Sequence, residues 1–77
     1  MKNNLIEQLI KEYGKVNFEK EFNKLSINQK KVLKLRYIDE NYTLDNVAEN
    51  LNSTREKVRN IEAKSIAFLK RNLEKNS

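Results

Sequence analysis

Apolar residues recur at intervals of three and four along most of the chain, which is the spacing of one helix face. A first helix is predicted at residues 2–13, where Asn3 or Asn4 can accept a first-turn amide hydrogen bond. Its apolar face comprises Leu5, Ile6, Leu9, Ile10 and Tyr13. Gly14 provides the stop, because glycine adopts left-handed backbone without steric cost. A second short helix is predicted at 17–24, with Phe18, Phe22 and Leu25 on one side.

The next segment carries a start signal as well as a periodic pattern. Ser26 and Gln29 match a capping box, in which each side chain bonds the backbone amide of the other residue. A helix is therefore predicted from Ile27 to Ile38, ending at the polar cluster 39–41. The side chains expected to point inward are Val32, Leu35 and either Tyr37 or Ile38. Those expected to stay in water are Lys30, Lys31, Lys34 and Arg36.

Residues 43–73 have the pattern of two helices joined by a tight turn. Thr43 is a good N-cap, and apolar residues follow it at the spacing of a short helix with one buried face. These residues are Leu44, Val47, Ala48 and Leu51. Asn52 and Ser53 form the turn, since asparagine tolerates positive φ. Thr54 caps the next helix, and a capping box from Ser53 to Glu56 is the competing assignment.

The second of these helices buries one face and leaves the other free. Its buried face comprises Val58, Ile61, Ser65, Phe68 and Leu69. A helix-turn-helix needs this arrangement, because both helices pack inward while the outer face of the second enters a DNA groove. The chain beyond about Lys70 is polar and is expected to fray.

Composition supports an all-α fold, a small bundle of four to five helices that contains the helix-turn-helix. The 77 residues include one Gly and no Pro, so helix breakers are scarce. The absence of Cys and His excludes disulfides, thiol nucleophiles, imidazole bases and the usual zinc sites. No nucleophile–base set or metal cluster is evident, so we expect no enzyme and no cofactor. No apolar run is long enough to cross a bilayer, and a cytoplasmic protein is expected.

The net charge of +5 is concentrated near the C-terminus. Residues 1–54 carry nine basic and eight acidic residues, whereas residues 55–77 carry seven and three. Clustered Lys and Arg suit double-stranded DNA, whose phosphates release counterions when they are neutralised. The alternative is an ordinary charged surface on an amphipathic helix.

The free face of the last helix carries the candidate DNA contacts. The base-reading residues are predicted to be Arg55, Glu56, Arg59 and Asn60, because the first turns of a recognition helix reach base edges. Arg can bond guanine, Asn adenine and Glu the cytosine amine. Residues to the sides or further along are assigned to phosphates: Thr54, Lys57, Lys64, Lys70 and Arg71. None of the four base-reading residues has an oppositely charged residue four positions away. A helix face that only stabilised the helix would more often show such i,i+4 ion pairs.

Residues 25–71 resemble region 4 of the primary bacterial sigma factors. Two blocks carry the resemblance, KVLKLRY at 31–37 and TREKVRNIEAKSIAFLK at 54–70. The resemblance implies a recognition helix that reads the −35 promoter element, and it places Arg36 and Thr43 at positions that touch the DNA backbone. It also implies docking on the flap of the RNA polymerase β subunit. The candidate docking residues are Leu33, Leu35, Tyr37 and Ile38.

The sequence departs from the pattern of the family at three positions. Asn60 stands where Gln is usual, which changes the expected base preference, and Asn28 replaces a common basic phosphate contact. Ser53 replaces a small hydrophobic residue in the turn, which should loosen packing. The chain also has no room for the domain that melts promoters.

We therefore expect a free-standing transcription regulator of phage or mobile-element origin, which acts in the bacterial cytoplasm, associates with the nucleoid and depends on another protein to melt promoters. Residues 25–77 form the region 4-like domain, and residues 1–24 form a helical segment that supports the core or docks on a partner. Two alternatives stay open. One is a protein–protein module that binds the β flap or a sigma factor with little DNA binding, and the other is a repressor-like homodimer that pairs through residues 1–24.

Overall fold

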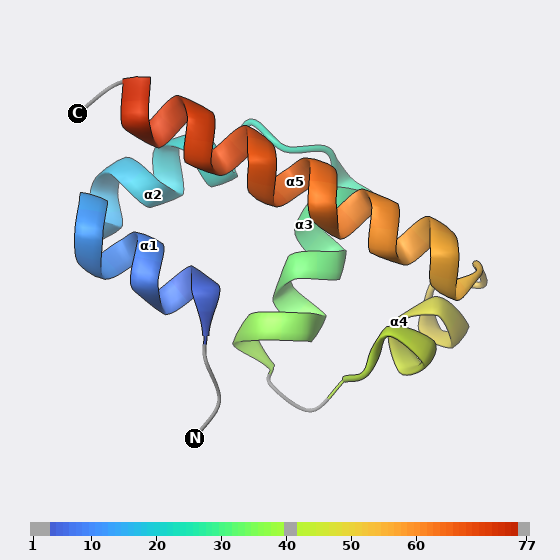
Figure 1. Cartoon of the computed structure of the whole chain (residues 1–77). Helices are drawn as coiled ribbons and strands as arrows, with labels where there is room; N and C mark the ends of the chain where they lie inside the picture. Colours follow the sequence, from blue (N-terminus) through green and yellow to red (C-terminus); the bar gives the residue numbers. More distant parts are fainter. Residues whose placement is uncertain (1–3, 40–41, 76–77) are drawn as a thin grey trace.

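The computed structural model describes residues 4–39 and 42–75, which form five α-helices and one π-helical turn (Figure 1). The elements are α1 (Leu5–Tyr13), α2 (Lys15–Phe22), α3 (Ile27–Leu33), the π-helical turn η1 (Lys34–Ile38), α4 (Leu44–Asn50) and α5 (Arg55–Lys75). The prediction of a small all-α bundle containing a helix-turn-helix is confirmed.

Two local signals organise the N-terminal part of the chain. Asn4 caps α1, since its side-chain oxygen accepts a hydrogen bond of 3.2 Å from the amide of Glu7. Asn3, the alternative cap, lies outside the described residues. Gly14 ends α1 with φ 91° and ψ 148°, a conformation that is almost restricted to glycine. Because the chain turns at this single residue, α2 begins at Lys15, two positions before the predicted start.

The predicted helix from Ile27 to Ile38 is continuous, but its last five residues are π-helical. The capping box is present, with Ser26 Oγ accepting from the Gln29 amide and Gln29 Oε1 accepting from the Ser26 amide. In η1 the amide of Asp39 donates to the carbonyl of Lys34, five residues earlier. Such a turn rotates the side chains that follow it relative to an α-helix.

The capping residues predicted from the sequence begin both helices of the helix-turn-helix. Thr43 Oγ1 accepts from the amide of Asn46 at 3.1 Å, and the Asn46 side chain bonds back to Thr43. Asn52 has φ 55° in the turn. Thr54 Oγ1 accepts from the amide of Lys57 at 3.2 Å, so Thr54 is the cap of α5 and the Ser53 assignment is wrong.

The core consists of two clusters of buried side chains. The first contains Ile6, Leu9, Phe18, Leu25, Leu33, Leu69 and Leu73. The second contains Val32, Val47, Ala48 and Val58. Helices α3 and α5 contribute to both, and Figure 1 shows α5 running along the molecule from α4 to α2.

The C-terminal part of α5 is packed, which corrects the expectation of fraying beyond Lys70. The helix continues to Lys75, and Leu73 is only 1% exposed in the first cluster. The apolar stripe of α1 faces the same cluster, where Ile6 and Leu9 are buried. Helices α1 and α2 thus supply core packing, one of the two roles that the sequence left open for this segment.

Candidate nucleic-acid interface

The four predicted base-reading residues lie together on the first two turns of α5. Arg55, Glu56, Arg59 and Asn60 are all exposed, whereas Val58 between them is fully buried. Val58 packs against Val47 and Ala48 of α4, so the buried side of the helix fixes the direction of the exposed side. The result is a polar helix N-terminus that projects from the helix-turn-helix, as groove reading requires.

Two ion pairs join these side chains to acidic neighbours. Arg59 Nη2 lies 3.4 Å from Glu56 Oε2, and Arg55 Nη1 lies 3.7 Å from Asp45 Oδ2 of α4. The first pair joins residues three apart, whereas the sequence pattern offered these side chains no ion pair at a spacing of four. Side chains this exposed form pairs worth only about 0–1 kcal/mol, so the guanidinium groups can exchange these carboxylates for DNA.

The predicted phosphate contacts flank this surface. Lys57 and Lys64 are exposed on α5, and none of the ion pairs among the described residues involves either one. Thr43 and Thr54 are exposed N-caps whose hydroxyl oxygens accept amide hydrogens. Each hydroxyl hydrogen can still be donated to a phosphate oxygen. Lys70 and Arg71 are also exposed, further along the same helix.

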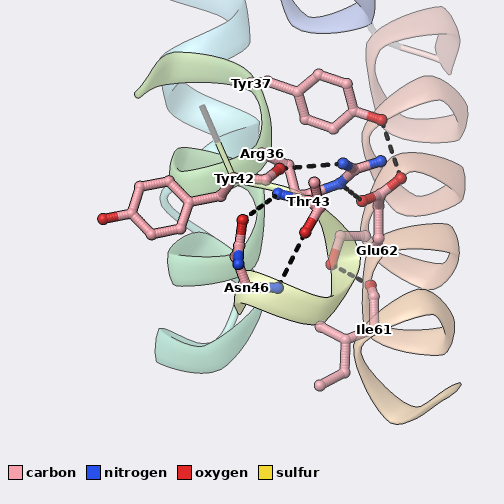
Figure 2. A network of polar contacts seen from close by, with 8 residues as sticks. Arg36, Tyr37, Tyr42, Thr43, Asn46, Ile61 and Glu62 are labelled. Atoms are coloured by element: carbon pink, nitrogen blue, oxygen red, sulfur yellow. Dashed lines mark hydrogen bonds and ion pairs between the residues drawn. The ribbon is translucent and has the colours of Figure 1, made fainter. Parts of the chain in front are cut away.

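Arg36 is held in a polar network, which corrects the expectation that it extends freely into water (Figure 2). Its Nε donates to Glu62 Oε1 at 2.8 Å, and its Nη1 donates to the carbonyl of Tyr42 at 3.2 Å. The other carboxylate oxygen of Glu62 accepts from the Tyr37 hydroxyl at 3.0 Å. The side chain of Arg36 is 27% exposed and that of Glu62 is 16% exposed.

Glu62 was not among the functional residues predicted from the sequence. Burial raises the pKa of Tyr37 to about 12, the hydrogen bond to Glu62 and the charge of Glu62 add to the shift, and the charge of Arg36 opposes it. The partners of Glu62 lie 25 and 26 residues earlier in the chain. The one available signal was a carboxylate placed between the buried positions Val58 and Ser65, where burial of a charge requires a partner.

The four docking candidates have different environments. Leu33 is fully buried in the first cluster, so its assignment to a docking surface is wrong. Leu35 packs on the second cluster and is half-buried. Tyr37 is half-buried, and Ile38 is 50% exposed.

Tyr37 and Ile38 line an apolar groove of about 510 Å³ between α1, α2 and η1. The other residues that line it are Asn4, Ile6, Glu7, Ile10, Lys15, Phe18, Glu19 and Phe22. With Tyr37 and Ile38 included, six of the lining side chains are apolar or aromatic and four are polar, and the polar ones comprise two carboxylates, one ammonium group and one amide. The groove lies on η1 and the first two helices, away from the exposed start of α5.

Within the described ranges, no three His, Cys, Asp or Glu side chains gather closely enough to hold a metal ion. No helix there is both long and apolar enough to span a membrane.

One family model matches the part of the chain that contains the helix-turn-helix. The family model for sigma-70, region 4, matches residues 22–71, which include the helix-turn-helix and the network around Glu62. Searches of the curated proteins and of the solved structures found no match to the chain. The matched segment covers more than half of the 77 residues. The chain therefore belongs to the sigma-70 region 4 family, whose members carry a helix-turn-helix that binds DNA.

Proposed function

We propose that the protein is a sequence-specific transcription regulator that reads a −35-like promoter element through the first two turns of α5. One observation carries the proposal. Four polar side chains with donor and acceptor groups stand exposed together at the start of α5, directly opposite the fully buried Val58. The family match supports it, because region 4 supplies a DNA-binding helix-turn-helix.

In this proposal the major groove receives the start of α5. Arg55 and Arg59 can each bond both acceptors of a guanine, Asn60 can bond adenine, and Glu56 can accept from a cytosine amine. The ion pairs with Asp45 and Glu56 are exchanged for these contacts. The flanking lysines and capping threonines bind phosphates, which fix the register of the helix without reading sequence.

Replacing Arg55 with alanine is expected to relax discrimination at one base pair, at a cost of about 1–3 kcal/mol, because one bidentate base contact is lost. Replacing Lys64 with alanine should instead weaken binding to all duplexes alike and reduce the salt slope by about one. Electrophoretic shifts with a randomised duplex library, at several salt concentrations, measure both effects.

The wild-type protein provides the reference for that experiment. Equal affinity for every duplex would contradict base reading, whereas no shift at low salt would contradict DNA binding altogether. A loss of specificity in the Lys64 variant comparable to that of Arg55→Ala would contradict the division into readers and phosphate contacts.

The second part of the proposal is that the groove between α1, α2 and η1 contacts RNA polymerase, at the flap of its β subunit. The observation in its favour is the partly exposed Ile38 beside an apolar groove that the fold leaves open. An apolar groove of this kind suits an amphipathic helix laid into it. Because the groove is separate from the start of α5, both partners can bind at once.

Replacing Ile38 with glutamate is expected to abolish flap binding and to leave DNA affinity unchanged, because a carboxylate would enter the apolar contact. Ile27→Glu is the matched control, since Ile27 is 74% exposed on α3 and does not line the groove. Titration with the purified β flap measures the first effect. Unchanged flap binding by Ile38→Glu would contradict the assignment of the groove. Flap binding without any DNA shift would favour the pure protein–protein module.

A homodimer through residues 1–24 stays a prediction. Ile6 and Leu9 of this segment are already buried within the chain, whereas Val16 is 79% exposed. Light scattering at several protein concentrations decides between a repressor-like dimer and a monomer.

A further inference from the structure

The Glu62 carboxylate joins three segments of the DNA-binding unit (Figure 2). It lies on α5, two residues after Asn60, and accepts hydrogen bonds from Arg36 and Tyr37 of η1. Through Arg36 it reaches the carbonyl of Tyr42, which directly precedes Thr43, the N-cap of α4. The network therefore adds a polar link between the start of α4 and α5 to the apolar packing of Val47, Ala48 and Val58.

The same contacts orient the Arg36 side chain and engage only part of its N–H donors. A guanidinium has five N–H donors in a rigid fork. One donor serves Glu62 and one serves the carbonyl of Tyr42. The side chain keeps 27% of its surface exposed, next to Thr43 at the start of α4. A guanidinium held in this way loses little conformational freedom when a phosphate binds to its remaining donors.

We propose that Glu62 is a positioning residue for DNA binding, which holds Arg36 and the start of α4 so that both meet phosphates while α5 lies in the groove. The proposal rests on the proposed DNA-binding function, because it concerns the same surface. Glu62 touches no DNA in this arrangement, and its effect is exerted through Arg36.

The sign of the expected effect separates positioning from simple electrostatics. Glu62 is a negative charge close to a surface that binds a polyanion, so its charge alone opposes DNA binding. If charge were its whole contribution, removing the carboxylate would strengthen binding. If it positions Arg36, removing it weakens binding, because the guanidinium is no longer held toward the phosphate.

Replacing Glu62 with alanine is expected to weaken binding to all duplexes by about tenfold, with base preference unchanged. The slope of log K against log salt should fall by about 0.9, as for the loss of one phosphate contact. Glu49→Ala is the matched control, since Glu49 is exposed on α4 and takes no part in the ion pairs of the described residues. Its affinity should be unchanged or slightly higher.

Two variants of Arg36 show whether Glu62 acts through it. In the Arg36→Ala background, adding Glu62→Ala should cause no further loss of affinity. Arg36→Lys keeps the positive charge, but its single ammonium cannot span both Glu62 and the carbonyl of Tyr42 in the geometry of a fork. It should therefore bind DNA as weakly as Arg36→Ala. A spectrophotometric titration should also show that the pKa of Tyr37 falls in Glu62→Ala.

The outcomes separate this inference from the proposed function. Unchanged or tighter binding by folded Glu62→Ala overturns the inference and leaves DNA reading intact, whereas a wild-type protein that binds no duplex overturns both. If circular dichroism shows that Glu62→Ala does not fold, Arg36→Lys decides, because wild-type affinity in that variant overturns positioning.

Discussion

Replacing Leu73 with alanine is expected to lower the free energy of unfolding by about 2–5 kcal/mol, the range for truncating a buried leucine. The side chain is 1% exposed and packs in the cluster that joins α1, α2, α3 and α5. A domain of this size has a total stability of about 4–12 kcal/mol, so the variant should be partly unfolded near physiological temperature. Urea denaturation followed by circular dichroism measures the loss.

Lys70→Ala is the matched control for this prediction, since Lys70 is exposed on the same helix. It should change the free energy of unfolding by no more than about 0.5 kcal/mol. A loss below about 1 kcal/mol in Leu73→Ala would mean that the last turns of α5 contribute little to the core. The contrast matters because the polar sequence around Leu73 had indicated a frayed end.

Replacing Gly14 with alanine is expected to lower the free energy of unfolding by about 1–3 kcal/mol through backbone strain alone. The φ of 91° and ψ of 148° lie in a region that is almost restricted to glycine. A Cβ atom at this position would meet no atom within 4 Å, so a steric clash contributes nothing. The same denaturation experiment measures the effect.

Asn52→Gly tests the other positive φ among the residues that the structure describes. Its φ of 55° is in the left-handed region that asparagine tolerates, so glycine there should change stability by less than about 1 kcal/mol. Stability of Gly14→Ala equal to that of the wild type would show that the junction of α1 and α2 can move into an ordinary conformation.

The local features of the helix-turn-helix could be predicted from sequence because their causes are local. Ser26, Thr43 and Thr54 cap helices whose first residues follow them directly, and each bond spans three residues. Asn52 takes the positive φ that its residue type allows. The exposed face of α5 follows from the periodicity of its buried face, so the position of the base-reading candidates on one side was also predictable.

The features that could not be predicted depend on contacts between distant parts of the chain. Arg36 was expected in water, but its carboxylate partner Glu62 lies 26 residues away in the chain. The π-helical turn was invisible for the same reason, since apolar spacing in Lys34–Ile38 fits an ordinary helix. Three of the four docking candidates lie in that turn, and Leu33 directly precedes it. Their environments differ, since Leu33 is buried and Ile38 is half exposed.

Because α3 and α5 contribute to both core clusters, the two proposed partner surfaces are thermodynamically linked. Adjacent residues of α3 enter different clusters, Val32 the one under the helix-turn-helix and Leu33 the one under α1 and α2. Neither half can lose its packing without disturbing a helix that the other half needs. A ligand that binds the folded groove therefore raises the population of the folded helix-turn-helix by mass action. By the reciprocity of linkage, DNA bound at the start of α5 would strengthen binding in the groove to the same extent.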